Sequence, residues 1–525
     1  MLPRMMYADG IRGKTTSEFK GLNHTRGAED GEVYWMENLS SDHAPVISPR
    51  EPRKNTGLEA DYIWSNGALY HARSGVIYRE GIQKATYTGT IKDVAALGFV
   101  TAILMADATL YIYDNAQTIK SAGASVAGLT VEVGDGEETE LSTITTTGQV
   151  DFTTLFKTGD GLTIAGAGEN DSTIIVRAVE AKKLTFYENS FREEGTFTNV
   201  TISRDVPEMD FICANENRLW GCKGDTIYAS KMGDPYNFNV FDGLADDSWA
   251  VQAGSGGSFT GCCSYLGYPV FFKEENIYKV YGDVASNFRL MGSANLGVME
   301  GAEKSLAIAG ETLFYLSRAG VMAYAGGMPA SISLPLGDMR FSEGVGGSDG
   351  LKYYISVKDE SGQYHIFVFD TRRKLWHRED GYRVKGWAWS SGLYMVRETT
   401  RDNVTKNELV LEVGDCDWVT CQGETVSAEV IFADFTDDSP YQKGIAKVLL
   451  RIELEANATL GVAIRYDSRT QWETVKTINQ AVAKRSFYLP VIPHRCDHFS
   501  IKVSGTGKWY LYSVTRELYS GTALH

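Results

Sequence analysis

Asn217-Arg218-Leu219-Trp220 is followed, three residues later, by Gly224-Asp225-Thr226-Ile227-Tyr228. This pair of segments is typical of two antiparallel strands, because aromatic and β-branched residues favour strands and glycine favours tight turns. Further pairs of this kind begin at Asn66, Ala108, Gly267, Gly310, Lys352 and Gly392. The sequence therefore predicts seven hairpins.

The hairpins recur at a nearly constant spacing. One aromatic residue marks each hairpin, and successive marks lie 41, 109, 51, 43, 40 and 40 residues apart. A period of roughly 40–50 residues is that of a four-stranded propeller blade. We therefore expect an all-β protein with a seven-bladed β-propeller over residues 55–119 and 207–417. The marks are Tyr70, Tyr111, Trp220, Phe271, Phe314, Tyr354 and Tyr394.

The interval of 109 residues indicates an inserted domain at residues 120–206. From Ser121 to Pro207 there are fourteen acidic and six basic residues, a net charge of −8 out of −16 for the whole chain. Strand-like segments occur at Gly161–Ile164, Thr173–Val176 and Lys183–Tyr187. A small acidic β-barrel or β-sandwich is the expected structure.

The period ends near residue 417, and residues 418–525 are predicted to form a C-terminal β-sandwich. Six segments there have the alternating pattern of strands, although Ile445–Glu455 also permits a helix. The segments are Ala428–Phe435, Lys447–Glu455, Thr459–Tyr466, Ser486–Leu489, His498–Val503 and Trp509–Val514.

Residues 1–54 are predicted to form an extended N-terminal arm, because Pro45, Pro49 and Pro52 disfavour a helix. Arg50, Arg53 and Lys54 give the arm a basic end that suits an acidic partner. Two placements remain open: the arm docks onto a neighbouring subunit, or it runs over its own propeller.

The most apolar segment, Val94–Tyr113, has the length of a membrane helix. Gly98 and Asp107 interrupt it, so we expect two buried strands around a turn and no membrane span. The N-terminal residues lack the apolar core of a signal peptide.

No motif in the sequence defines a catalytic, cofactor or metal site, and we expect a protein that is not an enzyme. His494, Cys496 and His498 would share one face of a strand, beside Asp497, but strand packing explains them more simply than a metal. Asp467–Trp472 resembles the aspartate box of sialidase propellers and is expected to be a polar hairpin turn. Gly254–Ser258 lacks the spacing of a nucleophile elbow and is expected to be a loop.

Other acidic pairs and the cysteines also have simple interpretations. Asp246-Asp247 and Asp437-Asp438 are expected to be solvated loop residues rather than glycosidase carboxylates. The seven cysteines are odd in number and lack metal-finger spacing, with Cys416 and Cys421 the closest approach to it. All seven are expected to be free thiols.

The net charge of −16 argues against a static grip on nucleic acid, because phosphate binding needs clustered Lys and Arg. Two interpretations remain. A negative wall repels DNA and lets it slide through a conduit, or the charge only keeps the protein soluble.

Three stretches resemble structural tail proteins of bacteriophages and prophages, described as DNA-stabilisation, hub or nozzle proteins. They are Phe19–Asn23 continuing to Pro45 and Arg53, Asn217–Gly221 continuing to Gly233-Asp234-Pro235-Tyr236-Asn237-Phe238, and Leu489–Phe499. The second is the most specific. Its Gly-Asp-Pro suits a tight turn, and the aromatic after it suits packing back onto the blade.

The resemblance implies a virion protein, assembled in the bacterial cytoplasm, that forms a homo-oligomeric ring at the lower end of the tail, with six copies expected. It implies contacts with other tail proteins (an adaptor, fibres or spikes), transient passage of genome DNA and no catalytic residues. The alternative is a receptor-binding or glycan-recognising or glycan-cleaving propeller of the tail. Convergent carboxylates and aromatics in a pocket on the propeller axis would favour that alternative.

Overall fold

The computed structural model describes residues 12–25, 27–134, 141–187, 190–414, 418, 424–436, 442–491 and 495–520. These residues form strands, turns and short 3-10 helices but no α-helix, which confirms the prediction of an all-β chain. No helix in this part of the chain is long and apolar enough to cross a membrane. The 3-10 helices are η1 (Phe152–Thr154), η2 (Gly168–Asn170), η3 (Ala285–Asn287), η4 (Glu303–Ser305) and η5 (Leu334–Leu336).

The chain divides into two compact units. Residues 61–303 form one, called the middle unit below, and residues 1–60 together with 304–525 form the other, called the terminal unit. Each unit is built mainly from four-stranded antiparallel sheets, the building block of β-propellers.

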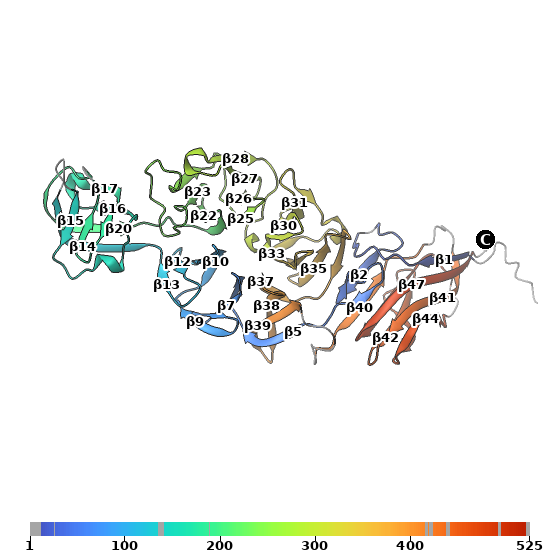
Figure 1. Ribbon diagram of the computed structural model, residues 1–525. Coiled ribbons are helices and arrows are strands. Elements are labelled where there is room, and N and C mark those ends of the chain that lie inside the picture. The colour runs from blue at the N-terminus through green and yellow to red at the C-terminus, as the bar shows by residue number, and fades with distance from the viewer. Residues whose placement is uncertain are drawn as a thin grey trace, which may run out of the picture. The chain divides into compact units, whose positions relative to one another are not determined.

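The middle unit contains four such sheets, each with its strands in chain order (Figure 1). The first strands β10, β21 and β25 of three consecutive sheets are neighbours. The strands are β6 (Tyr62–Ser65), β7 (Leu69–Arg73), β8 (Val76–Arg79), β9 (Ile82–Thr86); β10 (Ile91–Ala96), β11 (Thr101–Met105), β12 (Leu110–Tyr113), β13 (Ile119–Ser121); β21 (Phe211–Asn215), β22 (Arg218–Lys223), β23 (Thr226–Ala229), β24 (Trp249–Gln252); β25 (Gly261–Tyr265), β26 (Tyr268–Lys273), β27 (Asn276–Tyr281) and β28 (Arg289–Ser293).

A separate seven-stranded sheet lies between β13 and β21 in the sequence and has its own hydrophobic core, which includes Phe152, Leu162 and Ile202. Its strand order is β17-β16-β20-β14-β15-β19-β18. Three of its strands coincide with the segments expected from the sequence. The strands are β14 (Ala124–Gly134), β15 (Thr143–Thr146), β16 (Gly161–Ala165), β17 (Ser172–Ile175), β18 (Ala178–Val179), β19 (Lys183–Thr185) and β20 (Gly195–Arg204).

The terminal unit contains three more four-stranded sheets. The last of them takes its fourth strand, β5, from the N-terminal part of the chain, where β5 pairs antiparallel with β39. The strands are β29 (Ala307–Ala309), β30 (Thr312–Ser317), β31 (Gly320–Tyr324), β32 (Ala330–Ser331); β33 (Phe341–Ser348), β34 (Lys352–Asp359), β35 (Tyr364–Asp370), β36 (Leu375–Arg378); β37 (Arg383–Trp389), β38 (Leu393–Arg401), β39 (Val404–Val413) and β5 (Lys54–Glu59).

Two five-stranded antiparallel sheets follow in the terminal unit, β1-β47-β41-β44 with β45 beside β41, and β2-β40-β46-β42-β43. Six of their strands coincide with the expected C-terminal segments, and Ile445–Leu454 belongs to a strand rather than a helix. The strands are β1 (Arg12–Thr16), β2 (Val33–Glu37), β40 (Ser427–Phe432), β41 (Lys443–Leu454), β42 (Thr459–Tyr466), β43 (Glu473–Ile478), β44 (Val482–Leu489), β45 (Arg495–Cys496), β46 (Phe499–Thr506) and β47 (Trp509–Ser520).

The N-terminal segment forms strands that pair with other strands of the same chain. β1 pairs with β47 and β2 pairs with β40, while the short strands β3 (Leu39–Ser40) and β4 (Ser48–Pro49) pair with each other. The sequence left open docking onto a neighbouring subunit or a course over the chain's own propeller; in the described residues β1 and β2 instead join the two five-stranded sheets.

Buried aromatic residues on the second strands hold adjacent sheets together. Trp220 on β22 and Phe271 on β26 belong to one hydrophobic cluster, with ring centroids 6.4 Å apart. Removing such a side chain from water contributes about 1.5–3 kcal/mol. The aromatic residues that revealed the repeat are thus mainly core residues between sheets.

One of the seven hairpins was assigned to the wrong position in its sheet. Tyr111 lies on the third strand, β12, and Val94–Tyr113 contributes to three strands rather than two. The polar turn with Asp107 joins the second and third strands, whereas the turn between the first and second carries the apolar Phe99. Polar residues typical of a turn therefore mark the second turn more clearly than the first.

Candidate functional site

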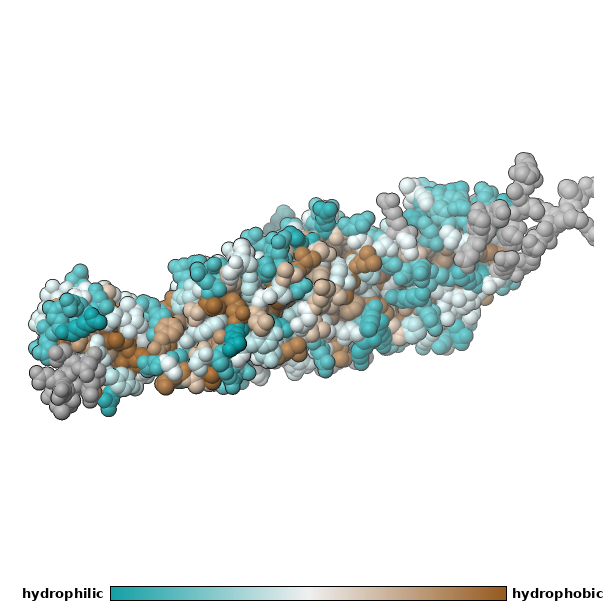
Figure 2. Space-filling model, turned by 90° about the horizontal axis from the view of Figure 1, so that it is seen from above, coloured by the Kyte–Doolittle hydropathy of each residue, from teal (hydrophilic) through white to brown (hydrophobic). Residues whose placement is uncertain are grey.

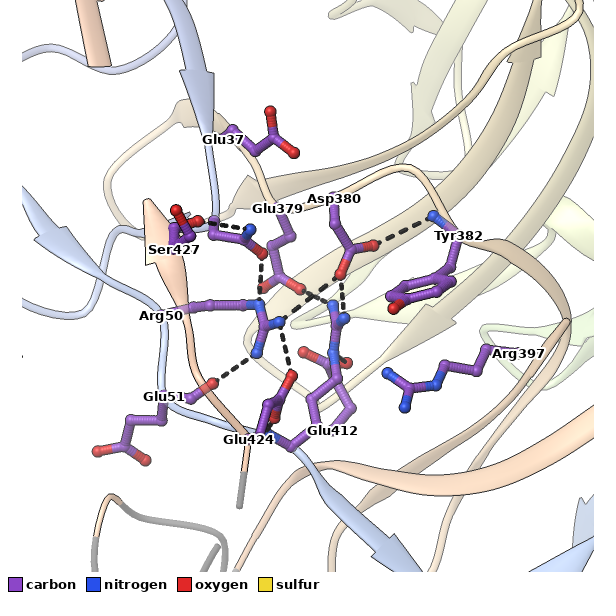
Figure 3. Close-up of polar contacts among 12 residues, drawn as sticks. Glu37, Arg50, Glu51, Glu379, Asp380, Tyr382, Arg397, Glu412, Glu424 and Ser427 are labelled. Carbon is purple, nitrogen blue, oxygen red and sulfur yellow. Dashed lines mark hydrogen bonds and ion pairs between the residues drawn. The ribbon is translucent and has the colours of Figure 1, made fainter. Parts of the chain in front are cut away.

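Six charged side chains form a buried cluster in the terminal unit, called the Arg53 cluster below (Figure 3). Figure 3 shows side chains from separate segments converging on two guanidinium groups. The members are Arg50, Arg53, Glu379, Asp380, Glu412 and Glu424.

Arg53 is the centre of this cluster, with a side chain that is 0% exposed. Its Nε donates to Glu412, its Nη1 to Asp380 and its Nη2 to Glu379, the last at 2.6 Å. Its backbone N–H donates to Glu424. A planar guanidinium with fixed donor directions is suited to holding several carboxylates at once.

Arg50 extends the cluster toward the start of β40. Its Nη2 donates to Glu424 Oε1 at 3.0 Å and its Nε donates to Asn38 Oδ1 at 2.9 Å. Its Nη1 donates to the carbonyl of Glu51 at 2.8 Å. The guanidinium is thereby paired on all sides although it is buried.

The cluster joins four segments that lie far apart in the sequence. The arginines precede β5, Glu379 and Asp380 follow β36, Glu412 belongs to β39 and Glu424 precedes β40. It therefore ties the N-terminal segment to two four-stranded sheets and to the β40 sheet. The basic end predicted from Arg50 and Arg53 meets its acidic partners within the same chain, while Lys54 is exposed.

Burial and charge act in opposite directions on the carboxylates. Burial raises the pKa of Asp380, but the charges of Arg53 and Arg50 outweigh it and hold that pKa below its usual value. Burial, reinforced by neighbouring Glu379, raises the pKa of Glu412 to about 8 against the attraction of Arg53. The raised pKa favours the protonated form of Glu412, and a proton there reduces the excess of four carboxylates over two guanidiniums.

The raised pKa of Glu412 predicts that stability falls as pH rises. A carboxyl group whose pKa is higher in the folded than in the unfolded protein stabilises the fold fully below its usual pKa, and this contribution is lost as pH rises toward about 8. We expect the urea midpoint to decrease from pH 6 to pH 9, and Glu412→Gln to flatten that decrease. Glu360→Gln, on an exposed side chain, serves as the control. An unchanged slope in Glu412→Gln would contradict the assignment.

A cavity of about 890 Å³ lies beside the Arg53 cluster. Arg397 also lines it, donates to Glu408 Oε2 at 3.1 Å from Nη2 and lies 4.6 Å from the ring centroid of Tyr382. Arg50, Arg53 and Arg397 are thus committed to partners in the chain, whereas Lys54 and Arg401, which also line the cavity, are exposed. The arrangement links segments that lie far apart in the sequence.

A second buried polar cluster fixes the seven-stranded sheet in the middle unit. Asp160, which is 0% exposed, pairs with Arg204 Nη1 at 2.6 Å and accepts from Asn237 Nδ2 at 2.9 Å. Asn237 Oδ1 accepts the N–H of Gly161 at 3.1 Å, and the Arg204 guanidinium lies 5.2 Å from the Tyr236 ring centroid. The segment after Gly-Asp-Pro therefore anchors this sheet.

The aromatic residue of that motif has the position expected from the sequence. Phe238 is buried in a cluster with Leu219 and Leu104 and packs between the β10–β13 and β21–β24 sheets. The sequence did not reveal that Asn237 and Tyr236, in the same motif, hold Asp160 and Arg204.

The structure brings together two motifs that the sequence left apart. Ser468 Oγ lies 2.7 Å from His498 Nε2, and the N–H of Asp497 donates to Asp467 Oδ1 at 2.7 Å. The Asp467 turn is thus tied to the residues just before β46. His494 lies outside the described residues, and within them no group of three or more His, Cys, Asp or Glu side chains could hold a metal ion.

The remaining motifs have structural roles or lie outside the description. The expectation that Asp247 is solvated is wrong, because it is buried and accepts from the N–H groups of Gly243 and Leu244; Asp246 pairs with Lys231 at 3.3 Å. Five cysteines are free thiols: Cys213, Cys222, Cys262, Cys263 and Cys496. Asp437-Asp438, Cys416 and Cys421 lie outside the described residues.

No family model and no curated protein sequence matches this chain. Solved structures similar to it include U3-55K, with 7% identity, a TM-score of 0.36 and coverage of 69% of this chain and 97% of that one. BamB from Moraxella catarrhalis shares 14% identity at a TM-score of 0.33, covering 67% and 95%. The WD40 domain of Toxoplasma gondii coronin shares 11% at 0.34, covering 76% and 90%.

Proposed function

We propose that this chain is a non-enzymatic structural protein of a bacteriophage virion, a hub or nozzle subunit of the tail. Its seven four-stranded sheets close into one seven-bladed β-propeller. Residues 120–206 then form an inserted domain, and residues 418–525, together with β1 and β2, form a C-terminal sandwich. The observation that supports the closure is the pairing of β5 with β39, because a last blade built from both sides of the chain links the two ends of a propeller.

Assembly into a homo-oligomeric ring is supported by exposed apolar residues at equivalent positions. In five of the seven sheets a large apolar residue is exposed in the turn between the first and second strands or within two residues of it. Apolar patches lie among hydrophilic stretches on the face shown in Figure 2. Recurrent exposed apolar residues suit contacts between protein surfaces. They are Phe99, Leu266, Ile308, Leu351 and Trp389.

The proposed ring is a conduit for genome DNA, with a channel lined mainly by acidic and neutral polar side chains. The support is the net charge of −16, of which −8 lies in residues 121–207. A wall rich in Lys and Arg would bind the phosphates at many points and hold the DNA. Copies joined head to tail form a closed ring when their rotation closes.

Imaging of the purified protein and of virions tests this proposal. We expect closed rings of identical copies at the tail end, and a solution mass that is a multiple of the chain mass. Trp389→Glu is expected to weaken the ring, whereas Tyr488→Glu, on an equally exposed residue of β44, is not. A single copy in the virion, or a channel wall dominated by Lys and Arg, would refute the proposal.

A further inference from the structure

The middle unit has a cavity of about 840 Å³ at the end where its first strands begin. Lys92 on β10, Asp210 and Phe211 at the start of β21, and Thr260 just before β25 contribute to its lining. The turn between β26 and β27 completes the wall. Its volume is within the range of about 300–1,000 Å³ typical of small-molecule sites.

The wall combines hydrogen-bonding groups with an aromatic surface. Lys92 Nζ pairs with Asp210 Oδ1 at 2.8 Å and lies 5.5 Å from the ring centroid of Phe211. Both charged side chains of this pair are partly exposed, and Phe211 is half-buried. Charged groups and an accessible ring therefore converge on one side of the cavity.

Lys273 lines the cavity although its residue is only 2% exposed. Its Nζ donates to the carbonyl of Ser255 at 2.7 Å and lies 5.0 Å from the ring centroid of Phe259. Within the described residues this is its one hydrogen bond, and it forms no ion pair there. An ammonium has three donors, so Lys273 retains capacity to bind a ligand oxygen.

A glycine-rich loop, Gly254–Ser258, borders the same cavity. Gly256 lines it, and a Cβ built on Gly256 meets no atom within 4 Å. Gly256 also does not have a positive φ. Neither backbone conformation nor crowding requires glycine here, and its effect is to leave the main chain open to close approach.

The charge of the cavity selects against anions. Lys92 and Asp210 neutralise each other, which leaves Lys273 with Glu274, Glu275 and Glu300. The resulting negative charge disfavours phosphates, nucleic acid and acidic sugars. Carboxylates accept hydrogen bonds from hydroxyl groups, the lysine donates to them, and the face of Phe211 suits the apolar face of a sugar ring.

We propose that this cavity is a binding site for neutral or amino-substituted saccharides, with Asp210, Phe211, Lys273 and Glu300 contacting the ligand. Binding requires only the middle unit of one copy, so it is independent of the proposed ring. The site would give the protein a recognition function in addition to a structural one.

A microarray of neutral, amino and acidic saccharides identifies a probe, and calorimetry with that probe measures its affinity. Gly256→Val is expected to abolish binding, because its side chain enters the cavity. Gly254→Val is the matched control, since a Cβ there also meets no atom within 4 Å but the residue does not line the cavity. Asp210→Asn is expected to weaken binding about tenfold or more, through the loss of a charged acceptor.

Three results would overturn the inference. One is that no neutral or amino saccharide is retained above the level seen with Gly256→Val. A second is that the retained saccharides are acidic. A third is that both glycine variants bind as the unchanged protein does. Oligomeric state is measured separately from saccharide binding. Rings without saccharide binding overturn this site but not the proposed tail function. Saccharide binding without rings overturns the proposed ring but not this site.

Discussion

Arg53→Met is expected to lower the free energy of unfolding by about 3–5 kcal/mol. The substitution removes the guanidinium that contacts Glu379, Asp380 and Glu412 together, and those carboxylates remain buried. An uncompensated buried charge is costly, because the protein interior solvates it far less well than water does. Methionine keeps much of the side-chain volume, so the effect reports charge rather than a cavity.

Chemical denaturation followed by fluorescence measures this change. The matched control is Arg340→Met, whose side chain is 87% exposed and whose nearest carboxylate, on Glu360, lies 3.8 Å away. We expect the control to change stability by less than about 0.5 kcal/mol. Adding Glu412→Gln and Asp380→Asn to Arg53→Met is expected to restore part of the loss. Equal stability of the Arg53 and Arg340 variants would show that the cluster does not hold the terminal unit together.

Asp160→Asn is the second substitution with a large expected effect, also about 3–5 kcal/mol. It preserves shape and a possible bond to Asn237 but leaves the Arg204 guanidinium buried without its carboxylate. The loss is expected to be local to the seven-stranded sheet and its anchor, because in the described part of the chain the Asp160 carboxylate bonds to Lys157, Arg204 and Asn237.

Hydrogen exchange resolves that local effect. Amides of β14, β16 and β20 are expected to lose protection in Asp160→Asn, while amides of β25–β28 keep theirs. Glu180→Gln, on an exposed residue of the same sheet region, is the control and should leave both sets unchanged. Unaltered protection of β16 in Asp160→Asn would mean that the anchor is unnecessary.

The sequence predicted the local structure of this chain better than its long-range contacts. Hairpins carry their own signal, since the two strands and the turn that joins them are consecutive in the sequence. The three hairpins of one sheet are alike, which explains why Tyr111 was placed on the wrong strand. Pairing of β1 with β47 leaves no local trace, because its partners are separated by most of the chain.

The Arg53 cluster was missed for the same reason. Arg50 and Arg53 precede a strand and look like the basic end of an exposed arm, and their carboxylates lie more than 300 residues further on. No local pattern marks Glu379, Asp380 or Glu412 as the partners of an arginine. The burial of a charged residue can be recognised only when the segments that surround it in the folded protein are known.

The pairing of β1 with β47 has a consequence for synthesis on the ribosome. Arg12 pairs with Leu518, so the first of these strands emerges long before the last exists. At about 5–20 residues per second the interval is roughly half a minute to a minute and a half. During this interval β1 lacks its strand partner. For most of the same interval β2 lacks its partner β40, so Val33 and Met36 stay uncovered. The nascent chain therefore exposes these apolar residues for most of its translation. A chaperone that covers them would raise the yield of folded protein.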